Sequence, residues 1–342
     1  MAVKKRWAIA AFLPFVLFAA FFPAAFGGQP AKVDGEVIPV KSLVINEFKR
    51  GAGNRFGKLE YLGGLVMATK NGEMGAISSI RILPDLKHFI SIMDTGHWAL
   101  GEIERDADGR LSGIADYKIY SMLGSASHKS KDHKDNLDAE GMVIADGHIY
   151  VSFERDHRIA AFPFEGFETA KPVKVEKPVL DEGYRLRNNG GIEAVLKSPD
   201  DGPLKGALAY VAERSYNDQG NFIAGVQSGP GKGMFFVERV GAYDVTDGVF
   251  LKDGTFLLLE REFGLKDGIG MRIRRFEGKD IAPGKTISGS IVMEADFSHQ
   301  IDNMEGLDAF TAADGSTHLI VTSDDNHSLL ERNLLLEFKM VE

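Results

Sequence analysis

Hydrophobic residues after position 30 fall into short runs rather than into the longer periodic segments typical of helices. Asp-Gly pairs separate many of these runs, and two strands joined by such a pair are the sequence signature of a β-hairpin. The chain contains 39 glycines, which suits many tight turns. Five such Asp-Gly pairs lie at 108–109, 146–147, 247–248, 253–254 and 314–315. The pattern predicts an all-β protein.

The apolar runs also repeat. In each of five units, a segment opened by a small-residue motif precedes an apolar strand that ends in an acidic residue. The opening segments are GAISSI (75–80), DAEGMVI (138–144), GGIEAVL (190–196), YDVTDGVFL (243–251) and DNMEGLDAF (302–310). The closing acids are Asp94, Glu154, Glu213, Glu260 and Asp324.

The closing acids are 60, 59, 47 and 64 residues apart, somewhat more than the ~40–45 residues of a four-stranded propeller blade. The stretch from Val33 to Lys70 is long enough for a sixth unit. We therefore expect one closed domain over residues 33–342, an all-β β-propeller with six blades, and five or seven blades as alternatives. A β-sandwich with accidental similarity between its strands is the remaining alternative.

If the units superpose, their acids occupy equivalent places around the propeller axis. The glutamates of the EG and EA pairs would form one tier at strand-to-turn junctions, namely Glu140, Glu193 and Glu305. The closing acids would form a second tier at strand ends. Crowded carboxylates repel one another, so they either raise their pKa values or recruit cations.

Oxygen ligands in a chain without cysteine favour a hard cation, and we expect Ca²⁺ as the cofactor. The expected metal ligands are Asp94, Glu140, Glu154, Glu193, Glu213, Glu260, Asp302 and Asp325. The alternative is a set of structural ion pairs between blades, since an arginine follows the closing acid in three units.

The last unit holds the densest acidic cluster, DNMEG at 302–306 and SDDNH at 323–327. The expected catalytic residues are Glu305, Asp324 and His327, with Arg261 from the preceding unit. Arginine can hold an anionic group through two parallel hydrogen bonds. The expected substrate-binding residues are Arg155, Arg214, Arg187 and His97.

The N-terminal segment has the layout of a secretory signal peptide. Lys4, Lys5 and Arg6 precede an apolar run over 8–22, and small residues follow at 24–28. A span of the membrane needs about 20 apolar residues, so we expect residues 1–28 to be a signal peptide, with an uncleaved anchor as the alternative. The predicted location is periplasmic or secreted.

The formal net charge of −9 argues against general nucleic-acid binding, which depends on Lys and Arg at phosphates. We expect no membrane contact beyond the possible N-terminal anchor, and a monomer. A serine esterase of the α/β-hydrolase type is not expected, because no G-x-S-x-G sequence occurs. The expected partner is a small anionic or ester substrate.

The same motifs carry a family resemblance. NNGGIEA at 188–194, LLERE at 258–262, DNMEG at 302–306 and SDDN at 323–326 resemble the phytase-like family described as "esterase-like activity of phytase" over about residues 60–340. The resemblance implies a β-propeller, often exported by bacteria, with phosphatase or esterase activity dependent on Ca²⁺.

Two functions remain open from the sequence. The first is an exported, metal-dependent hydrolase of phosphate or carboxylic esters, with its Ca²⁺ site ringed by carboxylates at one end of the channel; a lactonase-like propeller is a subclass that differs only in substrate. The second is a non-catalytic periplasmic propeller that binds a ligand or a protein. Ca²⁺ titration combined with an ester and phosphoester panel distinguishes them.

Overall fold

The structure is a computed structural model that describes residues 34–69, 74–124, 137–264 and 268–341. The expected signal peptide over 1–28 lies outside the described residues. Residues Val33–Glu342 form one compact unit. None of the helices in the described ranges has the length and apolar character that a membrane crossing requires.

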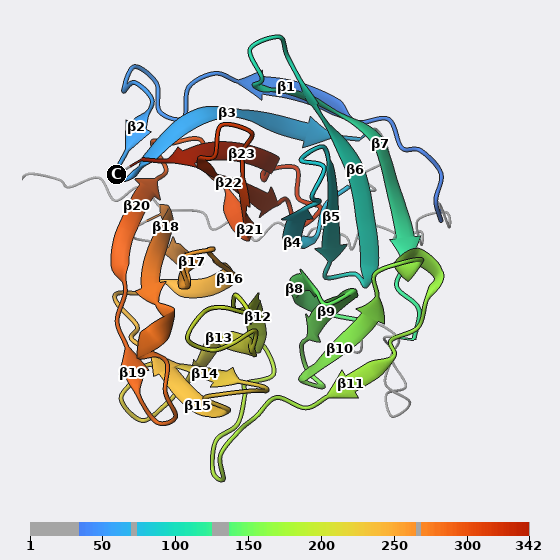
Figure 1. The fold of residues 1–342 in the computed structure, drawn as a ribbon. Helices are drawn as coiled ribbons and strands as arrows, with labels where there is room; N and C mark the ends of the chain where they lie inside the picture. The colour runs from blue at the N-terminus through green and yellow to red at the C-terminus, as the bar shows by residue number, and fades with distance from the viewer. Residues whose placement is uncertain (1–33, 70–73, 125–136, 265–267, 342) are drawn as a thin grey trace, which may run out of the picture. The chain divides into compact units, whose positions relative to one another are not determined.

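Five sheets surround a central axis in this unit (Figure 1), and their strands pair antiparallel except for the short edge strand β19, so the fold is an all-β propeller with five blades. Blade 1 is β4 (Ile77–Ile82), β5 (His88–Met93), β6 (His97–Arg105) and β7 (Leu111–Ser121). Blade 2 is β8 (Ala139–Ala145), β9 (His148–Phe153), β10 (Arg158–Pro163) and β11 (Lys174–Glu176). Blade 3 is β12 (Ile192–Lys197), β13 (Leu208–Tyr216), β14 (Phe222–Val226) and β15 (Gly233–Val237), with β19 (Thr286–Ile287) at its edge.

Blade 4 is β16 (Asp244–Phe250), β17 (Thr255–Gly264), β18 (Gly268–Glu277) and β20 (Ser290–Asp296). Blade 5 is β21 (Asn303–Thr311), β22 (Thr317–Asp324), β23 (Asn333–Met340) and β3 (Leu59–Ala68), with β1 (Lys41–Ile45) and β2 (Arg55–Phe56) beside β3. Within the described residues, the short 3₁₀ helices η2 (Phe167–Thr169) and η3 (Gly278–Asp280) lie between strands.

The expectation of six blades is wrong, because the stretch assigned to a sixth blade completes the fifth. The C-terminal unit supplies only β21, β22 and β23, and β3 pairs antiparallel with β23, with Leu65 opposite Leu335. In Figure 1 the light-blue β3 runs beside the dark-red β23. The two ends of the propeller chain therefore close the ring within one sheet.

The hydrophobic core is divided among the spaces between neighbouring blades. Five buried clusters occur, and each joins side chains of two adjacent sheets. In β17, Leu257 and Leu259 pack toward blade 5, whereas Phe256 and Leu258 pack toward blade 3. Successive side chains of a strand point to opposite faces of the sheet, so both faces of this sheet are buried.

The five inner strands β4, β8, β12, β16 and β21 line the axis, and each contacts the next around the ring. At mid-channel, Arg81 of β4 donates two hydrogen bonds to the carboxylate of Asp247 in β16, at 2.9 and 3.0 Å. Asp247 also accepts the Ser79 hydroxyl and the backbone N–H groups of Gly248 and Leu307. This buried ion pair therefore links three inner strands across the axis.

Replacement of Asp247 by asparagine should strongly destabilise the protein. The change keeps the shape of the side chain but leaves the Arg81 charge buried without its counter-charge, which typically costs about 3–5 kcal/mol. We expect a loss of this size in the free energy of unfolding, measured by urea denaturation.

Asp314→Asn is the matched control, since Asp314 pairs with Lys339 on the exposed surface. Water screens such a pair, so its loss should change stability far less. Equal losses in the two variants would contradict a central role for the buried pair.

Candidate functional site

A cavity of about 350 Å³ occupies the end of the channel at which the inner strands begin. Eight carboxylates and three guanidinium groups line it, a formal excess of five negative charges. The lining acids are Asp94, Asp138, Glu140, Glu154, Glu193, Glu213, Glu305 and Asp324. The lining arginines are Arg155, Arg214 and Arg261.

A β-bulge in every inner strand positions the first tier of side chains. In β12, Ile192 pairs with Ala212 and Ala194 with Val211, so Glu193 is the extra residue. The same shift occurs at the equivalent place in the other inner strands. The bulged positions are Ser78, Glu140, Glu193, Thr246 and Glu305. The tier of glutamates thus lies on bulges within strands rather than at the strand-to-turn junctions expected from the sequence.

The second tier lies on the strand that pairs with each inner strand. The last residue before the bulge has a partner on this neighbouring strand, and the second-tier position is the residue that follows that partner. In blades 1, 2, 3 and 5 this position holds Asp94, Glu154, Glu213 and Asp324. Their side chains face the same cavity as the bulged residues. The structure therefore brings both expected tiers together in blades 2, 3 and 5, whereas blade 1 contributes only its closing acid, Asp94.

Blade 4 departs from the expected register by one residue. Val245, the last residue before the bulge, pairs with Glu260, so the place of the closing acid belongs to Arg261. Because neighbouring residues of a strand point to opposite sides, Glu260 turns away from the cavity. Glu260 is fully buried between Arg272 and Arg274 and forms an ion-pair cluster with them. This residue was expected to be a metal ligand, but it lies outside the cavity.

Two glycines of the NNGG segment hold Glu154 in place. The backbone N–H groups of Gly190 and Gly191 donate to Glu154 Oε1 at 2.6 and 2.8 Å. Gly190 has a φ of 144°, and a Cβ there would meet the Arg214 side chain at 2.6 Å. The tight backbone of this segment therefore fixes one carboxylate of the cavity.

Two groups of acids bring their oxygens close enough to share a cation. In the groups Asp138–Glu140–Glu154 and Glu154–Glu193–Glu213, one oxygen of each residue lies within 4.8 Å of the others. Ca²⁺ binds oxygen at 2.3–2.6 Å, so ligands on opposite sides of one ion are about 5 Å apart. The separations therefore suit a hard cation, and Glu154 belongs to both groups.

Glu140 and Glu193 carry the least compensated charges of the cavity. Burial raises the pKa of each carboxyl well above its usual value, and neighbouring carboxylates raise it further. Among the described residues, no basic side chain lies within ion-pair distance of either group. A bound cation would supply the missing positive charge.

Glu305 is better compensated. Arg261 donates to its Oε1, and Asn303 donates to the same oxygen at 2.8 Å. Burial raises the pKa of Glu305 to about 7, although Arg261 opposes the shift, and Asp324 adds to it. A carboxyl that titrates near neutral pH can both release and accept a proton under ordinary conditions.

The arginines of the cavity rim are tied to acids. Arg214 contacts Glu213 Oε1 at 2.9 Å and donates from Nε to Asp244 at 2.7 Å. Arg155 donates to Asp138 at 3.0 Å. Both side chains are more than 40% exposed and lie at the mouth of the cavity.

Besides Glu260, five residues expected at the site lie outside the cavity lining. Asp302 pairs with Arg332 at 3.0 Å. Asp325 accepts hydrogen bonds from the Asn333 side chain and the backbone N–H of His327. The remaining ones are His327, Arg187 and His97, of which His327 and Arg187 are exposed and His97 contacts Thr95 at 3.0 Å.

Sequence reasoning missed two polar lining residues, Ser78 and Asp138. Asp138 begins the DAEGM motif and lies opposite Glu154, because Ala139 pairs with Phe153. Asp138 is the cross-strand partner of a closing acid, so the strand register alone could have identified it as a residue of the cavity.

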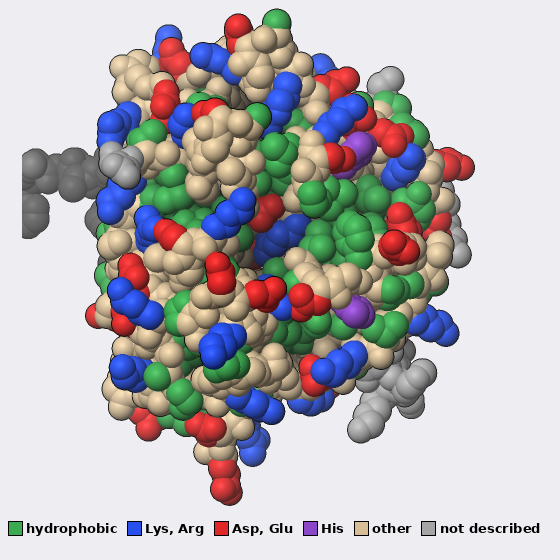
Figure 2. All heavy atoms as spheres, in the orientation of Figure 1, with side chains coloured by type: hydrophobic (Ala, Val, Ile, Leu, Met, Phe, Trp, Pro, Cys, Tyr) green, Lys and Arg blue, Asp and Glu red, His purple; other side chains and the backbone are tan. Residues whose placement is uncertain are grey.

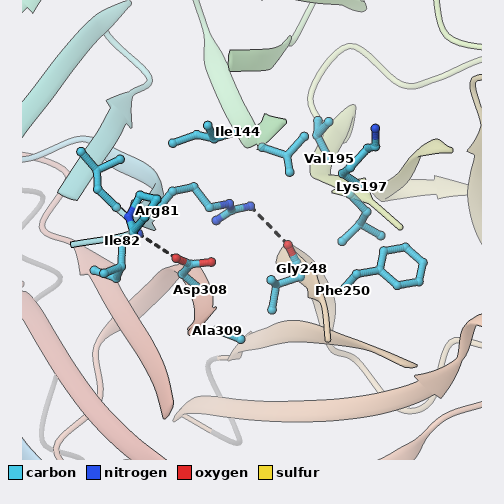
Figure 3. Close-up of a pocket in the computed structure, with 14 residues that line it drawn as sticks. Arg81, Ile82, Ile144, Val195, Lys197, Gly248, Phe250, Asp308 and Ala309 are labelled. Atoms are coloured by element: carbon cyan, nitrogen blue, oxygen red, sulfur yellow. Dashed lines mark hydrogen bonds between the residues drawn. The ribbon is translucent and has the colours of Figure 1, made fainter. Parts of the chain in front are cut away.

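The opposite end of the channel differs in chemistry. A second cavity of about 310 Å³ is lined mainly by apolar residues from the ends of the inner strands, among them Ile144, Val195 and Phe250 (Figure 3). Asp308 accepts the backbone N–H of Ile82 at 2.7 Å, and burial raises the pKa of its carboxyl to about 6. Figure 2 shows the ring hollowed at its centre, with acidic and basic side chains at the bottom.

Comparisons with known proteins give one family. The model of the family described as "Phytase-like: Esterase-like activity of phytase" matches residues 72–327, about three quarters of the chain. No curated protein matches the sequence.

Solved structures give distant likenesses. An endo-arabinase from Bacteroides thetaiotaomicron VPI-5482 has 10% identity and a TM-score of 0.49, with 78% of this chain and 94% of that chain covered. The PQQ-bound aldose sugar dehydrogenase from Streptomyces coelicolor has 13% identity and a TM-score of 0.42, with 88% and 99% covered. Likenesses of this size carry no argument about the chemistry of this chain.

The thermal stability of the chelator-treated protein should fall as the pH rises from 5 to 8. Glu140, Glu193 and Glu305 have folded-state pKa values above their unfolded ones, so the folded state binds more protons between the two values. Stability is therefore lost as pH rises through this window and levels off above the folded pKa. Differential scanning fluorimetry measures the trend.

Glu140→Gln should make this pH dependence shallower, because the amide carries no charge at any pH. Glu277→Gln, at an exposed position on β18, should leave it unchanged. Parallel curves for the wild type and Glu140→Gln would show that the cavity acids do not carry the effect.

Proposed function

The chain belongs to the phytase-like family, as its motifs indicated, and from this premise we propose that it is an exported, metal-dependent hydrolase of phosphate or carboxylic esters. The proposed centre is the carboxylate-lined cavity at one end of the propeller channel, with Ca²⁺ as the cation. Export rests on the signal-like residues 1–28.

One observation carries the proposal. Two clusters of three acids, Asp138–Glu140–Glu154 and Glu154–Glu193–Glu213, share Glu154 within a cavity that has an excess of five negative charges. A purely structural ring of acids would be expected to resemble Glu260 and Asp247, each of which is buried against arginine. Glu140 and Glu193 have no such partner among the described residues. Their electrostatic cost favours a role that brings in positive charge.

The donor set fits a hard divalent cation. All candidate ligands are carboxylate oxygens, their spacing agrees with Ca²⁺–oxygen distances, and the chain has no cysteine that would favour softer metals. Asp138, Glu140, Glu154, Glu193 and Glu213 would hold the ion or ions. When bound, such a cation polarises a phosphoryl or carbonyl oxygen and lowers the pKa of bound water.

The protein's own side chains supply the other requirements of ester hydrolysis. Arg155 and Arg214 lie at the mouth, and Arg214 would orient an anionic group, since guanidinium binds phosphate or carboxylate oxygens through parallel hydrogen bonds. Arg261 keeps Glu305 in position within the cavity. Water forms the new bond to phosphorus or carbon, the ester bond breaks, and the leaving oxygen takes the proton that Glu305 holds. The Glu305 carboxylate formed in this way regains a proton from the attacking water, which leaves the side chain as it began.

A non-catalytic binding propeller is the second candidate, and one set of contacts favours it. Glu213 Oε1 contacts both Arg214 and Arg261, and Arg214 continues to Asp244. This chain of ion pairs joins blades 3 and 4 and would stabilise the ring without chemistry. Such a protein would bind a cation or ligand but turn over no ester.

Calorimetric titration of the chelator-treated protein with Ca²⁺ should show binding that Glu193→Gln weakens at least tenfold. The amide retains one oxygen donor but removes the charge on which hard-cation affinity depends. Glu277→Gln is again the control and should bind like the wild type. Equal Ca²⁺ affinity in the wild type and Glu193→Gln would contradict the assignment of this centre.

Glu305→Gln should lower kcat for a model ester or phosphomonoester by about 10²–10⁴-fold, the usual contribution of a positioned acid or base. The wild-type pH profile should show a limb near pH 7 that the variant lacks. Steady-state kinetics with Ca²⁺ present measures both. Absence of turnover by the wild type across a broad panel would favour the binding propeller.

A further inference from the structure

Large hydrophobic side chains project into solvent beside the proposed centre. Among the residues that the structure describes, the four most exposed are Leu329, Leu330, Phe263 and Phe297, at 104%, 94%, 78% and 77%. A single exposed apolar residue is ordinary on a protein surface. A group of them indicates a binding surface.

All four residues belong to the end of the propeller that holds the carboxylate cavity. Phe263 follows Arg261 on β17 and pairs with Ile269 at the start of β18. Phe297 follows Asp296, which pairs with Gly270 on the same side of blade 4. Leu329 and Leu330 lie between Asp324, where β22 ends, and Asn333, where β23 begins. Blades 4 and 5 are neighbours, so the residues gather over one sector of the ring.

A cavity of about 630 Å³ connects two of these residues, Phe263 and Leu330, to the proposed centre. Phe263, Ile269 and Leu330 line it, and we refer to these three side chains as the apolar wall. The remaining lining includes four residues that also line the carboxylate cavity, namely Arg214, Arg261, Glu305 and Asn326. A molecule in this space would touch the apolar wall and Glu305 together.

The acids around the apolar wall are already paired. Asp302 is held by Arg332, and Glu331 accepts a hydrogen bond from Asn326 at 2.8 Å. Asp244 is held by Arg214, Arg239 and Tyr216. A highly charged polyanion would therefore find few uncommitted cations on this side and would leave the apolar wall in water.

We propose that the substrate carries an apolar group, an acyl chain or an aryl ring, that lies against the apolar wall while its ester group reaches Arg261 and Glu305. The inference rests on the proposed function, because it places the reacting group at the same centre. Burial of the apolar group supplies binding energy in proportion to its area. The preferred substrate is an amphiphilic ester, bound as a single molecule, rather than a compact polyphosphate.

Alkylphosphonates of two to eight carbons test the wall without requiring turnover. With Ca²⁺ present, calorimetry should show affinity for the wild type rising roughly two- to fourfold per methylene group. In Phe263→Ser/Leu330→Ser the slope should flatten while the affinity for the two-carbon compound changes little. Val175→Ser, an exposed apolar residue on β11, is the control and should retain the slope. Equal affinity of the wild type for short and long chains would overturn the proposal.

A parallel series of 4-nitrophenyl esters, kept below micelle-forming concentrations, separates the two proposals. Binding that depends on chain length, without any hydrolysis, would refute the proposed hydrolase but support the role of the apolar wall. Hydrolysis that does not depend on chain length would support the hydrolase but refute the role of the apolar wall. Cosedimentation of the wild type, but not the double variant, with phosphatidylcholine vesicles, combined with no chain-length dependence for single molecules, would assign these residues to a lipid surface and overturn the proposal.

Discussion

One extra residue in each inner strand determines what faces the end of the channel. A β-strand alternates its side chains between two faces, and an inserted residue reverses that alternation from its own position onward. Before the bulge, the strands present residues that pack between blades. At the bulge, Glu140, Glu193 and Glu305 turn toward the axis instead. Because the insertion falls at the same level in all five blades, these side chains converge although they are distant in sequence.

The chain treats its buried charges in two distinct ways. Asp247 and Glu260 are surrounded by guanidinium and backbone donors, so their charges serve the packing of the ring. Glu140 and Glu193, in contrast, face one another and further carboxylates across a small cavity. The difference lies in the partners rather than in the degree of burial, and it separates acids that stabilise the fold from acids that are costly to it. The electrostatic cost of these acids is confined to one end of the axis, where a bound cation or substrate can relieve it.

Repetition made much of this architecture predictable from sequence. The five opening segments and closing acids gave the propeller and most of the cavity lining. The blade count failed because β3 pairs with β23, a contact between distant parts of the chain that leaves no local pattern. The error at Glu260 arose because LLLERE offers three consecutive charged residues, and only the bulge opposite them decides that Arg261 faces the channel. Asp302, Asp325 and His327 are near the site in sequence, yet their contacts turn them to other partners.

The pairing of β3 with β23 also determines the order of steps in folding. Leu65 and Leu335 are 270 positions apart, so the first strands of the propeller must wait for the last before the ring can close. Contacts so distant in sequence form slowly, and until then β3 and β22 have open edges onto which other chains could add. A nascent or truncated chain would therefore lack both a closed ring and a completed cavity. Loss of a few C-terminal residues should therefore lead to aggregation.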